Sequence, residues 1–322
     1  MAHNLNFKNG KASMFYNSEK PWHSLGTKVE GLLTAAEAIV AAQLDYTVEK
    51  VPVQYIFNGE VRTNEGHFNT VRTDTGDALG VVGKRYEILQ NKNALSLLDA
   101  IVGAKDAIYE TAGALGLGEK VWLLAKLPGY IRTVGDDVTE KFLLLSNSHD
   151  GSGSVEVMFT PIRVVCQNTL NVAIQSKSRS IKIRHTLNLG QKVQDAQETL
   201  GIMSQRFSIF EEASQKLATV QMSQKSLKDY VVSTGLIPTV LDEKDQSQRA
   251  RNIMEQVSNL FDHGRGADLP GVKGTLWGAF NAVVEYTDYF RGNGENRTKS
   301  LLYGSGANIK QEAFEKALVL AK

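Results

Sequence analysis

Residues 46–82 read YTVEKVPVQYIFNGEVRTNEGHFNTVRTDTGDALGVV, and this stretch decides the fold. Runs rich in β-branched and aromatic residues predict three strands in it, over residues 46–57, 67–73 and 78–82. Asn58-Gly59 favours a tight turn, because both residues tolerate a positive φ. A second turn is indicated at Asp74-Thr75-Gly76-Asp77. The stretch therefore predicts an antiparallel meander in which consecutive strands pair.

Helices and further strands are expected on both sides of this meander. Thr34-Ala35-Ala36-Glu37 has the pattern of a capping box, which predicts a short helix ending near Gln43. Helical spacing of leucines predicts another helix over residues 91–102. Apolar or alternating runs predict strands over residues 120–127, 141–146, 154–159 and 179–187. Residues 161–175 are expected to form a helix.

After Gly190 the composition favours helix. Residues 191–234 contain few Gly or Pro and many Ala, Gln, Glu, Lys and Leu, which predicts one long helix or a helical pair. Further helices are expected over residues 245–261, 275–290 and 310–321. We expect an α+β fold, an antiparallel sheet with crossing helices followed by a mostly helical C-terminal region. The expected domains are an α+β core with an N-terminal arm (1–190) and a helical region (191–322).

Composition excludes several classes of protein. Thirty-six Lys and Arg against 35 Asp and Glu give a formal net charge of +1, which excludes a globally basic nucleic-acid binder. A single cysteine, Cys166, excludes a disulfide framework and a Cys-based metal site within one chain. No apolar run approaches the roughly 18–20 residues of a membrane span. The N-terminus lacks the apolar segment of a signal peptide. We expect a soluble, cytoplasmic protein.

No stretch matches the motif of an enzyme. Gly113–Gly118 lacks the Lys-Ser/Thr pair of a P-loop, and we expect it to be a turn between the end of a helix and a strand. The six histidines form no HxH or HExxH pair. Cys166 is expected in the core and His149-Asp150 in a hydrogen-bonded turn, with a Cys–His nucleophile and a nuclease-like pair as alternatives. The sequence predicts no catalytic residue, no cofactor and no metal ion.

Positive charge is concentrated in one stretch. No acidic residue occurs between Glu156 and Asp195. Lys182 and Arg184 are two residues apart on a predicted strand, so they project from one face about 7 Å apart. This spacing is close to the phosphate repeat of an extended single strand. A Gly-rich segment with basic residues follows at residues 291–306. The predicted DNA-binding residues are Arg163, Lys177, Arg179, Lys182, Arg184, Arg291, Arg297 and Lys299. The alternative is a solvated or neutralised strand face.

Five segments together resemble the bacterial phage/plasmid-like protein family, a domain of unknown function. They are residues 21–26 (PWHSLG), 81–91 (VVGKRYEILQN), 161–170 (PIRVVCQNTL), 277–288 (WGAFNAVVEYTD) and 305–314 (SGANIKQEAF). The resemblance implies a protein of a phage, prophage or plasmid that works in the bacterial cytoplasm, and it implies no chemistry. At the level of fold, the chain is similar to the RecT and Redβ single-strand-annealing proteins. That similarity implies a basic groove and assembly into a ring or filament.

These observations lead to three hypotheses of function. The first is a single-stranded DNA-binding, strand-annealing protein that requires neither ATP nor a metal ion and forms a homo-oligomer. Neutralised phosphates lower the repulsion between strands and leave the bases free to pair. The second is a counter-defence or assembly protein that binds a host protein through residues 245–322. The third is a nuclease or other hydrolase that uses Asp136, Asp137, His149 and Asp150.

Overall fold

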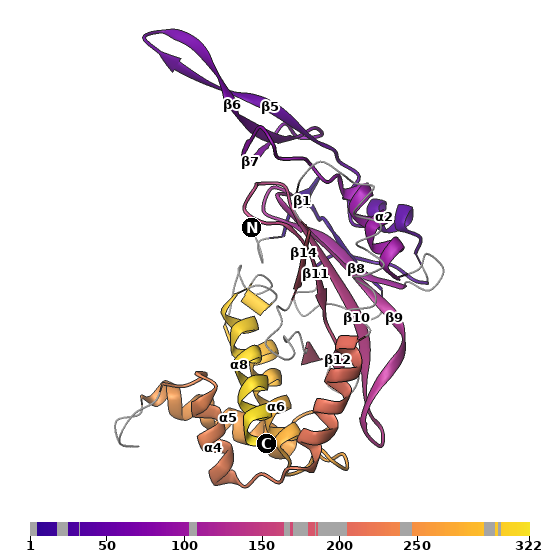
Figure 1. Cartoon of the computed structure of the whole chain (residues 1–322), viewed down its shortest axis with the longest axis vertical. Helices are drawn as coiled ribbons and strands as arrows, with labels where there is room; N and C mark the ends of the chain where they lie inside the picture. Colours follow the sequence, from indigo (N-terminus) through magenta and orange to yellow (C-terminus); the bar gives the residue numbers. More distant parts are fainter. Residues whose placement is uncertain are drawn as a thin grey trace. The chain divides into compact units, whose positions relative to one another are not determined.

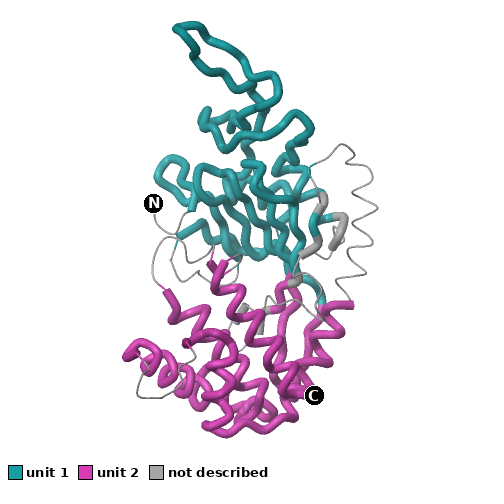
Figure 2. Tube along the Cα trace, turned by 60° about the vertical axis from the view of Figure 1, so that its left-hand side comes forward, with its two compact units in different colours: residues 1–128, 143–158, 180–202 teal, residues 129–142, 159–179, 203–322 magenta. Residues whose placement is uncertain are grey.

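The protein has an α+β fold with antiparallel sheets and with most of its helices after residue 205 (Figure 1). The computed structural model describes residues 5–17, 25–31, 33–102, 108–163, 168–169, 180–183, 185, 205–238, 247–292, 300–301 and 304–322. The chain forms two compact units (Figure 2). Unit 1 comprises Met1–Pro128, Leu143–Met158 and Ser180–Ile202, and unit 2 comprises Gly129–Phe142, Phe159–Arg179 and Met203–Lys322. The domain boundary expected after residue 190 stays a prediction, because residues 186–204 lie outside the described ranges.

Unit 1 contains the predicted meander. Strands β5 (Val48–Phe57), β6 (Glu60–Arg72) and β7 (Ala78–Gly83) form a three-stranded antiparallel sheet in that order. Asn58 and Gly59 have φ values of 52° and 80°, so they make the tight turn that the sequence predicts. Strand β6 begins seven residues before its predicted start, because Glu60 already pairs with Phe57 across the turn.

Arg72 anchors this meander to the rest of unit 1. Its side chain is only 1% exposed and pairs with Asp74, with 2.7 Å between Nε and Oδ1. Its Nη1 also donates to Asn6 Oδ1 at 3.0 Å and to Leu117 O at 2.9 Å, and its guanidinium lies 3.8 Å from the ring centroid of Tyr46. Burial acts to raise the pKa of Asp74, but Arg72 and Lys8 outweigh this effect and lower the pKa to about 2.

A second sheet has nine strands. The order of its main path is β13-β12-β10-β9-β8-β3-β4, and β11 pairs with both β10 and β14. Its strands are β3 (Met14–Tyr16), β4 (Thr27–Lys28), β8 (Ile108–Leu115), β9 (Lys120–Val134), β10 (Asp137–Ser148), β11 (Val155–Phe159), β12 (Ile162–Arg163), β13 (Asn168–Thr169) and β14 (Ser180–Ile183). Two short strands, β1 (Phe7–Lys8) and β2 (Lys11–Ala12), form a separate pair. The strands predicted at residues 120–127, 141–146 and 154–159 are confirmed. Of the strand predicted at residues 179–187, the part over residues 180–183 is confirmed as β14.

The helix expected over residues 161–175 is wrong in its described part. Strands β12 and β13 pair antiparallel there, with Ile162 opposite Thr169 and Arg163 opposite Asn168. β-Branched residues such as Ile162 and Thr169 favour extended backbone, and here each has a neighbouring strand to pair with. Apolar spacing alone did not separate a helix from two short strands in this segment.

The segment Gly113–Gly118 does not end a helix as expected. Its first three residues belong to strand β8, and the turn falls at Gly116 and Gly118, with φ values of 63° and 107°. Gly113 lies opposite Trp122 of strand β9, and a Cβ atom at Gly113 would come within 2.5 Å of the indole ring. The ring of Trp122 thus occupies the space that a side chain at position 113 would need.

The two helices predicted in unit 1 are confirmed. Helix α1 (Ala35–Ala41) begins with a complete capping box, in which Thr34 and Glu37 bond each other's backbone N–H. Helix α2 spans Asn91–Val102, the predicted residues. The core of unit 1 is formed by fully buried apolar side chains from α2 and the large sheet, among them Phe15, Leu98, Tyr109, Leu123 and Leu145.

Unit 2 contains the helices expected after Gly190. They are residues 205–219, α4 (Gln224–Ser233), α5 (Gln248–His263), α6 (Leu276–Glu285) and α8 (Ser305–Leu320). The described part of 191–234 is therefore a helical pair. Helix α6 buries all ten of its residues, so it is not the amphipathic helix expected from the sequence. Its Trp277 packs with Phe210 and Phe280, and both of these rings pack with Phe314, with ring centroids 5.5 to 6.1 Å apart.

Within the described ranges, none of the helices combines the length and apolar character that crossing a membrane requires.

Candidate functional site

Most of the basic stretch predicted to bind DNA lies outside the described residues. The predicted residues outside the described ranges are Lys177, Arg179, Arg184, Arg297 and Lys299. Only the main chain of Arg163 is described, in β12. Lys182 is exposed on β14, and its Nζ is 3.4 Å from Glu156 Oε1 on the paired strand β11. Such a surface ion pair stabilises the fold by at most about 1 kcal/mol, but it balances the charge of Lys182. The predicted basic face stays a prediction.

Arg291 lies at the end of a π-helical turn. This turn, η3 (Tyr286–Phe290), follows α6 directly. The backbone N–H of Arg291 donates to Tyr286 O at 2.9 Å, the i to i+5 bond of a π-helix. Its Nη1 donates to Ser305 Oγ at the start of α8 at 3.2 Å. π-Turns inside helices are frequent at functional sites, so the surface beside η3 is a candidate site.

A groove of about 470 Å³ lies between α5 and η3 within unit 2. It is lined by Arg249, Asn252, Ile253, Gln256, Tyr286 and Phe290. The four α5 residues are spaced i, i+3, i+4 and i+7, so they share one face of the helix. On the opposite wall the rings of Tyr286 and Phe290 are nearly parallel, 12° apart in plane with centroids 6.4 Å apart. The ring of Phe290 is 50% exposed.

Two arginines make this groove positive. Burial raises the pKa of the Tyr286 hydroxyl, and the charges of Arg249 and Arg291 oppose that rise. Arg249 is exposed, and the described part of the chain offers it no carboxylate within ion-pair distance. Asn252 Oδ1 accepts a hydrogen bond from Gln248 Nε2 at 2.8 Å, which leaves its amide N–H groups for another acceptor.

Contacts with other parts of unit 2 hold η3 in place. Nζ of Lys310, a fully buried residue of α8, donates to Asp288 Oδ1 at 2.9 Å. Thr287 Oγ1 donates to Val283 O at 2.8 Å, and the guanidinium of Arg265 lies 4.7 Å from the ring centroid of Tyr289. These contacts engage the middle residues of the turn, while Tyr286 and Phe290 line the groove.

The groups in this groove are suited to binding rather than to proton transfer. Guanidinium groups pair with phosphates, side-chain amides bond the edges of bases, and aromatic rings stack on base faces. None of the six lining residues is a carboxylate, histidine or cysteine. Across the described residues, no group of three or more His, Cys, Asp and Glu is placed to hold a metal ion.

The sequence predicted Arg291, which directly follows η3, but none of the six residues that line the groove. The missed signal is a polar stripe at Arg249, Asn252 and Gln256, followed in the chain by two aromatic residues four apart, Tyr286 and Phe290. Each half of the pattern is common on helices. Only the contact between α5 and η3 combines them into one surface.

His149 and Asp150 form the hydrogen-bonded turn that the sequence favoured. His149 is fully buried, with Nε2 2.9 Å from Asn91 Oδ1. The carboxylate of Asp150 accepts hydrogen bonds from Ser148 Oγ at 2.6 Å and from the backbone N–H of Ser152 at 2.8 Å. Asp137, which the hydrolase hypothesis also named, accepts the indole N–H of Trp277 at 2.7 Å. Both carboxylates therefore have clear structural partners.

Burial of His149 predicts a loss of stability in mild acid. Burial and the nearby charge of His185 lower the pKa of His149 to about 4, from 6.5. Between these values the unfolded chain binds a proton that the folded chain does not. The free energy of unfolding is therefore not reduced by this group above pH 6.5, and it falls by about 3 kcal/mol as the pH is lowered to 4. Urea unfolding of the parent and of His149→Gln across this range measures it. The parent should lose more stability than the variant, and equal losses would contradict the assignment.

No curated protein and no solved structure matches the chain. The family model described as a domain of unknown function (DUF932) matches residues 78–307. The matched range includes the α5–η3 groove and begins after strand β6. Because the match covers well over half of the 322 residues, the chain belongs to the DUF932 family.

Proposed function

We propose that the chain binds single-stranded DNA in the α5–η3 groove and promotes pairing of complementary strands, without nucleotide hydrolysis or a metal ion. The observation that carries this proposal is the combination of Arg249 and Arg291 with the stacked rings of Tyr286 and Phe290. Proteins that bind single strands without strong sequence preference combine a positive groove with rings on which bases stack. The groove brings both kinds of group together over a few residues.

A single strand fits this groove better than a duplex. Stacking on the half-exposed ring of Phe290 requires a base with a free face, and bases inside a duplex are already stacked on both sides. The side-chain amides of Asn252 and Gln256 offer both donors and acceptors, so they suit the edges of several bases. We therefore expect binding with little sequence preference.

Pairing follows from charge neutralisation along the bound strand. Two complementary strands repel each other through their phosphates, and cations on the protein lower that repulsion. In this proposal the predicted basic residues Arg163, Lys177, Arg179, Lys182 and Arg184 extend the phosphate contacts, as do Arg297 and Lys299. The proposed setting is the cytoplasm of a bacterium, for a protein of phage or plasmid origin that acts as a homo-oligomer.

Two substitutions separate stacking from charge in this groove. Phe290→Ala should weaken binding of a single-stranded oligonucleotide about 5- to 150-fold, because a stacked base contributes about 1–3 kcal/mol. The salt dependence should stay as in the parent. Arg249→Ala should weaken binding and also reduce the slope of log affinity against log salt by about 0.7, the value for one phosphate contact on a single strand. Fluorescence anisotropy of a labelled oligonucleotide measures both.

The matched controls are Arg251→Ala, two residues away on α5, and Val319→Ala, at an exposed apolar position of α8. Neither residue lines the groove, so both variants should bind as the parent does. A third variant changes Arg179, Lys182 and Arg184 together to Ala. If this triple variant loses binding while Phe290→Ala and Arg249→Ala do not, the groove is the wrong site. If the parent does not bind DNA at all, the proposed function is wrong.

A further inference from the structure

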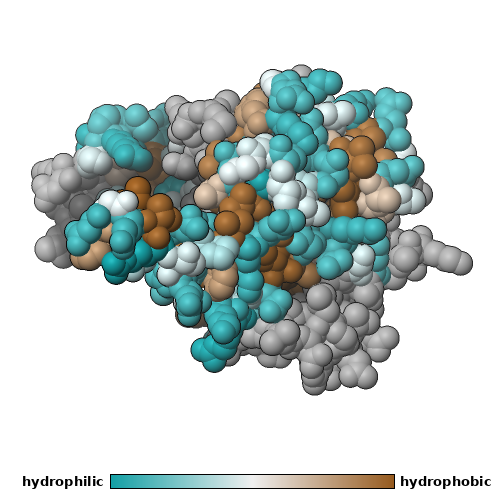
Figure 3. All heavy atoms as spheres, turned by 90° about the horizontal axis from the view of Figure 1, so that it is seen from above, coloured by the Kyte–Doolittle hydropathy of each residue, from teal (hydrophilic) through white to brown (hydrophobic). Residues whose placement is uncertain are grey.

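The β5–β6 hairpin carries an apolar tip that unit 1 does not cover. Four apolar side chains of the tip are at least half exposed: Tyr55 (50%), Ile56 (76%), Phe57 (52%) and Val61 (65%). Strand β7 pairs with β6 only from His67 onward, so the outer part of the hairpin is two-stranded and extends outward (Figure 1). Exposed apolar side chains also show as brown spheres among hydrophilic ones in Figure 3. An apolar cluster on an extended hairpin is typical of an interaction surface.

The charges of this hairpin favour a protein partner over nucleic acid. Residues 49–68 contain the bases Lys50 and Arg62 against the acids Glu49, Glu60 and Glu65. A surface without excess positive charge does not attract a phosphate backbone. At the tip, Arg62 Nη2 is 3.2 Å from Glu60 Oε2, and the Arg62 guanidinium lies 5.1 Å from the ring centroid of Phe57. The tip is therefore apolar, with one acid and one base beside it.

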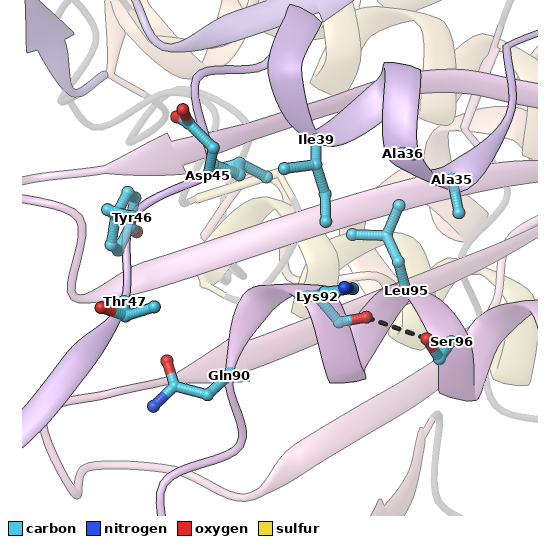
Figure 4. Close-up of a pocket in the computed structure, with 11 residues that line it drawn as sticks. Ala35, Ala36, Ile39, Asp45, Tyr46, Thr47, Gln90, Lys92, Leu95 and Ser96 are labelled. Carbon is cyan, nitrogen blue, oxygen red and sulfur yellow. Dashed lines mark hydrogen bonds between the residues drawn. The ribbon is translucent and has the colours of Figure 1, made fainter.

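Unit 1 also contains an apolar pocket between α1 and α2. Its volume is about 380 Å³, and Figure 4 shows Ile39 and Leu95 approaching each other across it. Leu44 adds to the apolar lining. Asp45 and Lys92 also line it and are exposed, and neither forms an ion pair with the described residues. The volume is within the range of pockets that bind a partner group of drug-like size.

We propose that the hairpin tip of one copy of this chain inserts into the α1–α2 pocket of a second copy. The apolar tip matches the apolar lining, and its Glu60 and Arg62 complement Lys92 and Asp45 at the pocket. A copy cannot fill its own pocket with its own tip. Tyr46 and Thr47 line the pocket just before β5 begins, and Phe57 lies ten residues further along, about 30 Å away on an extended strand.

Tip and pocket are different surfaces, so this contact is head-to-tail. Repeated head-to-tail contacts form a ring if the rotation closes and a filament if it does not. The inference names the surfaces of self-association, and it does not rest on DNA binding in the α5–η3 groove.

Cysteine cross-linking tests this contact. In a Cys166→Ser background, Ile56→Cys places one thiol on the tip and Ala36→Cys places one at the pocket. Each variant alone, and a mixture of the two, is treated with a short bis-maleimide. We expect dimers cross-linked in the mixture and none with either variant alone. Dimers from Ile56→Cys alone would show tip-to-tip pairing, and an absence of dimers in the mixture would exclude the contact. Either result overturns the proposal.

Sedimentation velocity gives an independent readout. Ile56→Asp places a charge on the tip, and Ala36→Trp fills the pocket. Both should shift the parent assembly to monomer, whereas Val319→Asp, at an exposed apolar position outside unit 1, should leave it unchanged. A monomeric parent, or variants that assemble as the parent does, would contradict the proposal. Circular dichroism confirms that each variant is folded.

Discussion

We expect Lys310→Met to lower the free energy of unfolding by about 3–5 kcal/mol. Lys310 is fully buried, and its Nζ donates to Asp288 Oδ1 at 2.9 Å. Methionine has a similar volume but no charge, so the variant leaves the buried carboxylate of Asp288 without that counter-charge. Because this ion pair joins α8 to the π-turn η3, the substitution should also weaken DNA binding. Urea unfolding followed by circular dichroism measures the loss.

The control for this prediction is Lys316→Met on the same helix. Lys316 is exposed, so this variant should stay within about 0.5 kcal/mol of the parent. A double variant, Lys310→Met with Asp288→Leu, removes both charges and should recover part of the lost stability. A loss below about 1 kcal/mol for Lys310→Met would show that the ion pair is not buried as described.

Trp277→Ala should also lower the stability by about 3–5 kcal/mol. Trp277 is fully buried and packs on Phe210 and Phe280, so its removal leaves a large cavity in the core of unit 2. Its indole N–H also donates to Asp137 Oδ2 at 2.7 Å, and Asp137 is itself fully buried. The substitution therefore removes ring packing and a hydrogen bond to a buried carboxylate together.

Trp277→Phe separates these two contributions. It keeps most of the ring packing but removes the indole N–H, so we expect a loss of about 1–3 kcal/mol. Tyr130→Ala, at a half-exposed aromatic position, serves as the control and should cost less than about 1 kcal/mol. If Trp277→Ala unfolds at the same urea concentration as the parent, the ring cluster is not the core of unit 2.

Local signals predicted the parts of the fold that depend on neighbouring residues. The capping box at Thr34 and Glu37 fixed the start of α1, because both groups lie within one helical turn. Asn58-Gly59 fixed the turn between β5 and β6, because few other pairs adopt two positive φ values. Each signal is complete within a few residues, so tertiary contacts did not change the outcome.

Contacts between distant residues decided what the sequence could not predict. Trp122 of the next strand lies over Gly113 in β8, and the sequence around Gly113 does not indicate that contact. Helix α6 was expected to have a polar face, yet Asn281 and Glu285 are buried with the rest of the helix. Hydrogen bonds such as that from Asn281 Nδ2 to Trp277 O accommodate the polar groups there.

The candidate site was predictable only in part for the same reason. Arg291 was identified by its charge and its glycine-rich neighbours. Tyr286 and Phe290 line the groove because of the π-turn, whose extra residue per turn changes the directions of the side chains. Arg249 and Gln256 belong to the site only through the contact of α5 with that turn.

The most direct test is the binding of the purified parent chain to labelled single-stranded and double-stranded oligonucleotides over roughly 50 to 300 mM salt. We predict tighter binding to the single strand, because only unpaired bases have free faces for Phe290 and Tyr286. The affinity should fall steadily as salt rises, because phosphate contacts release counterions. Equal affinity for duplex, or no binding at the lowest salt, would contradict the proposed function.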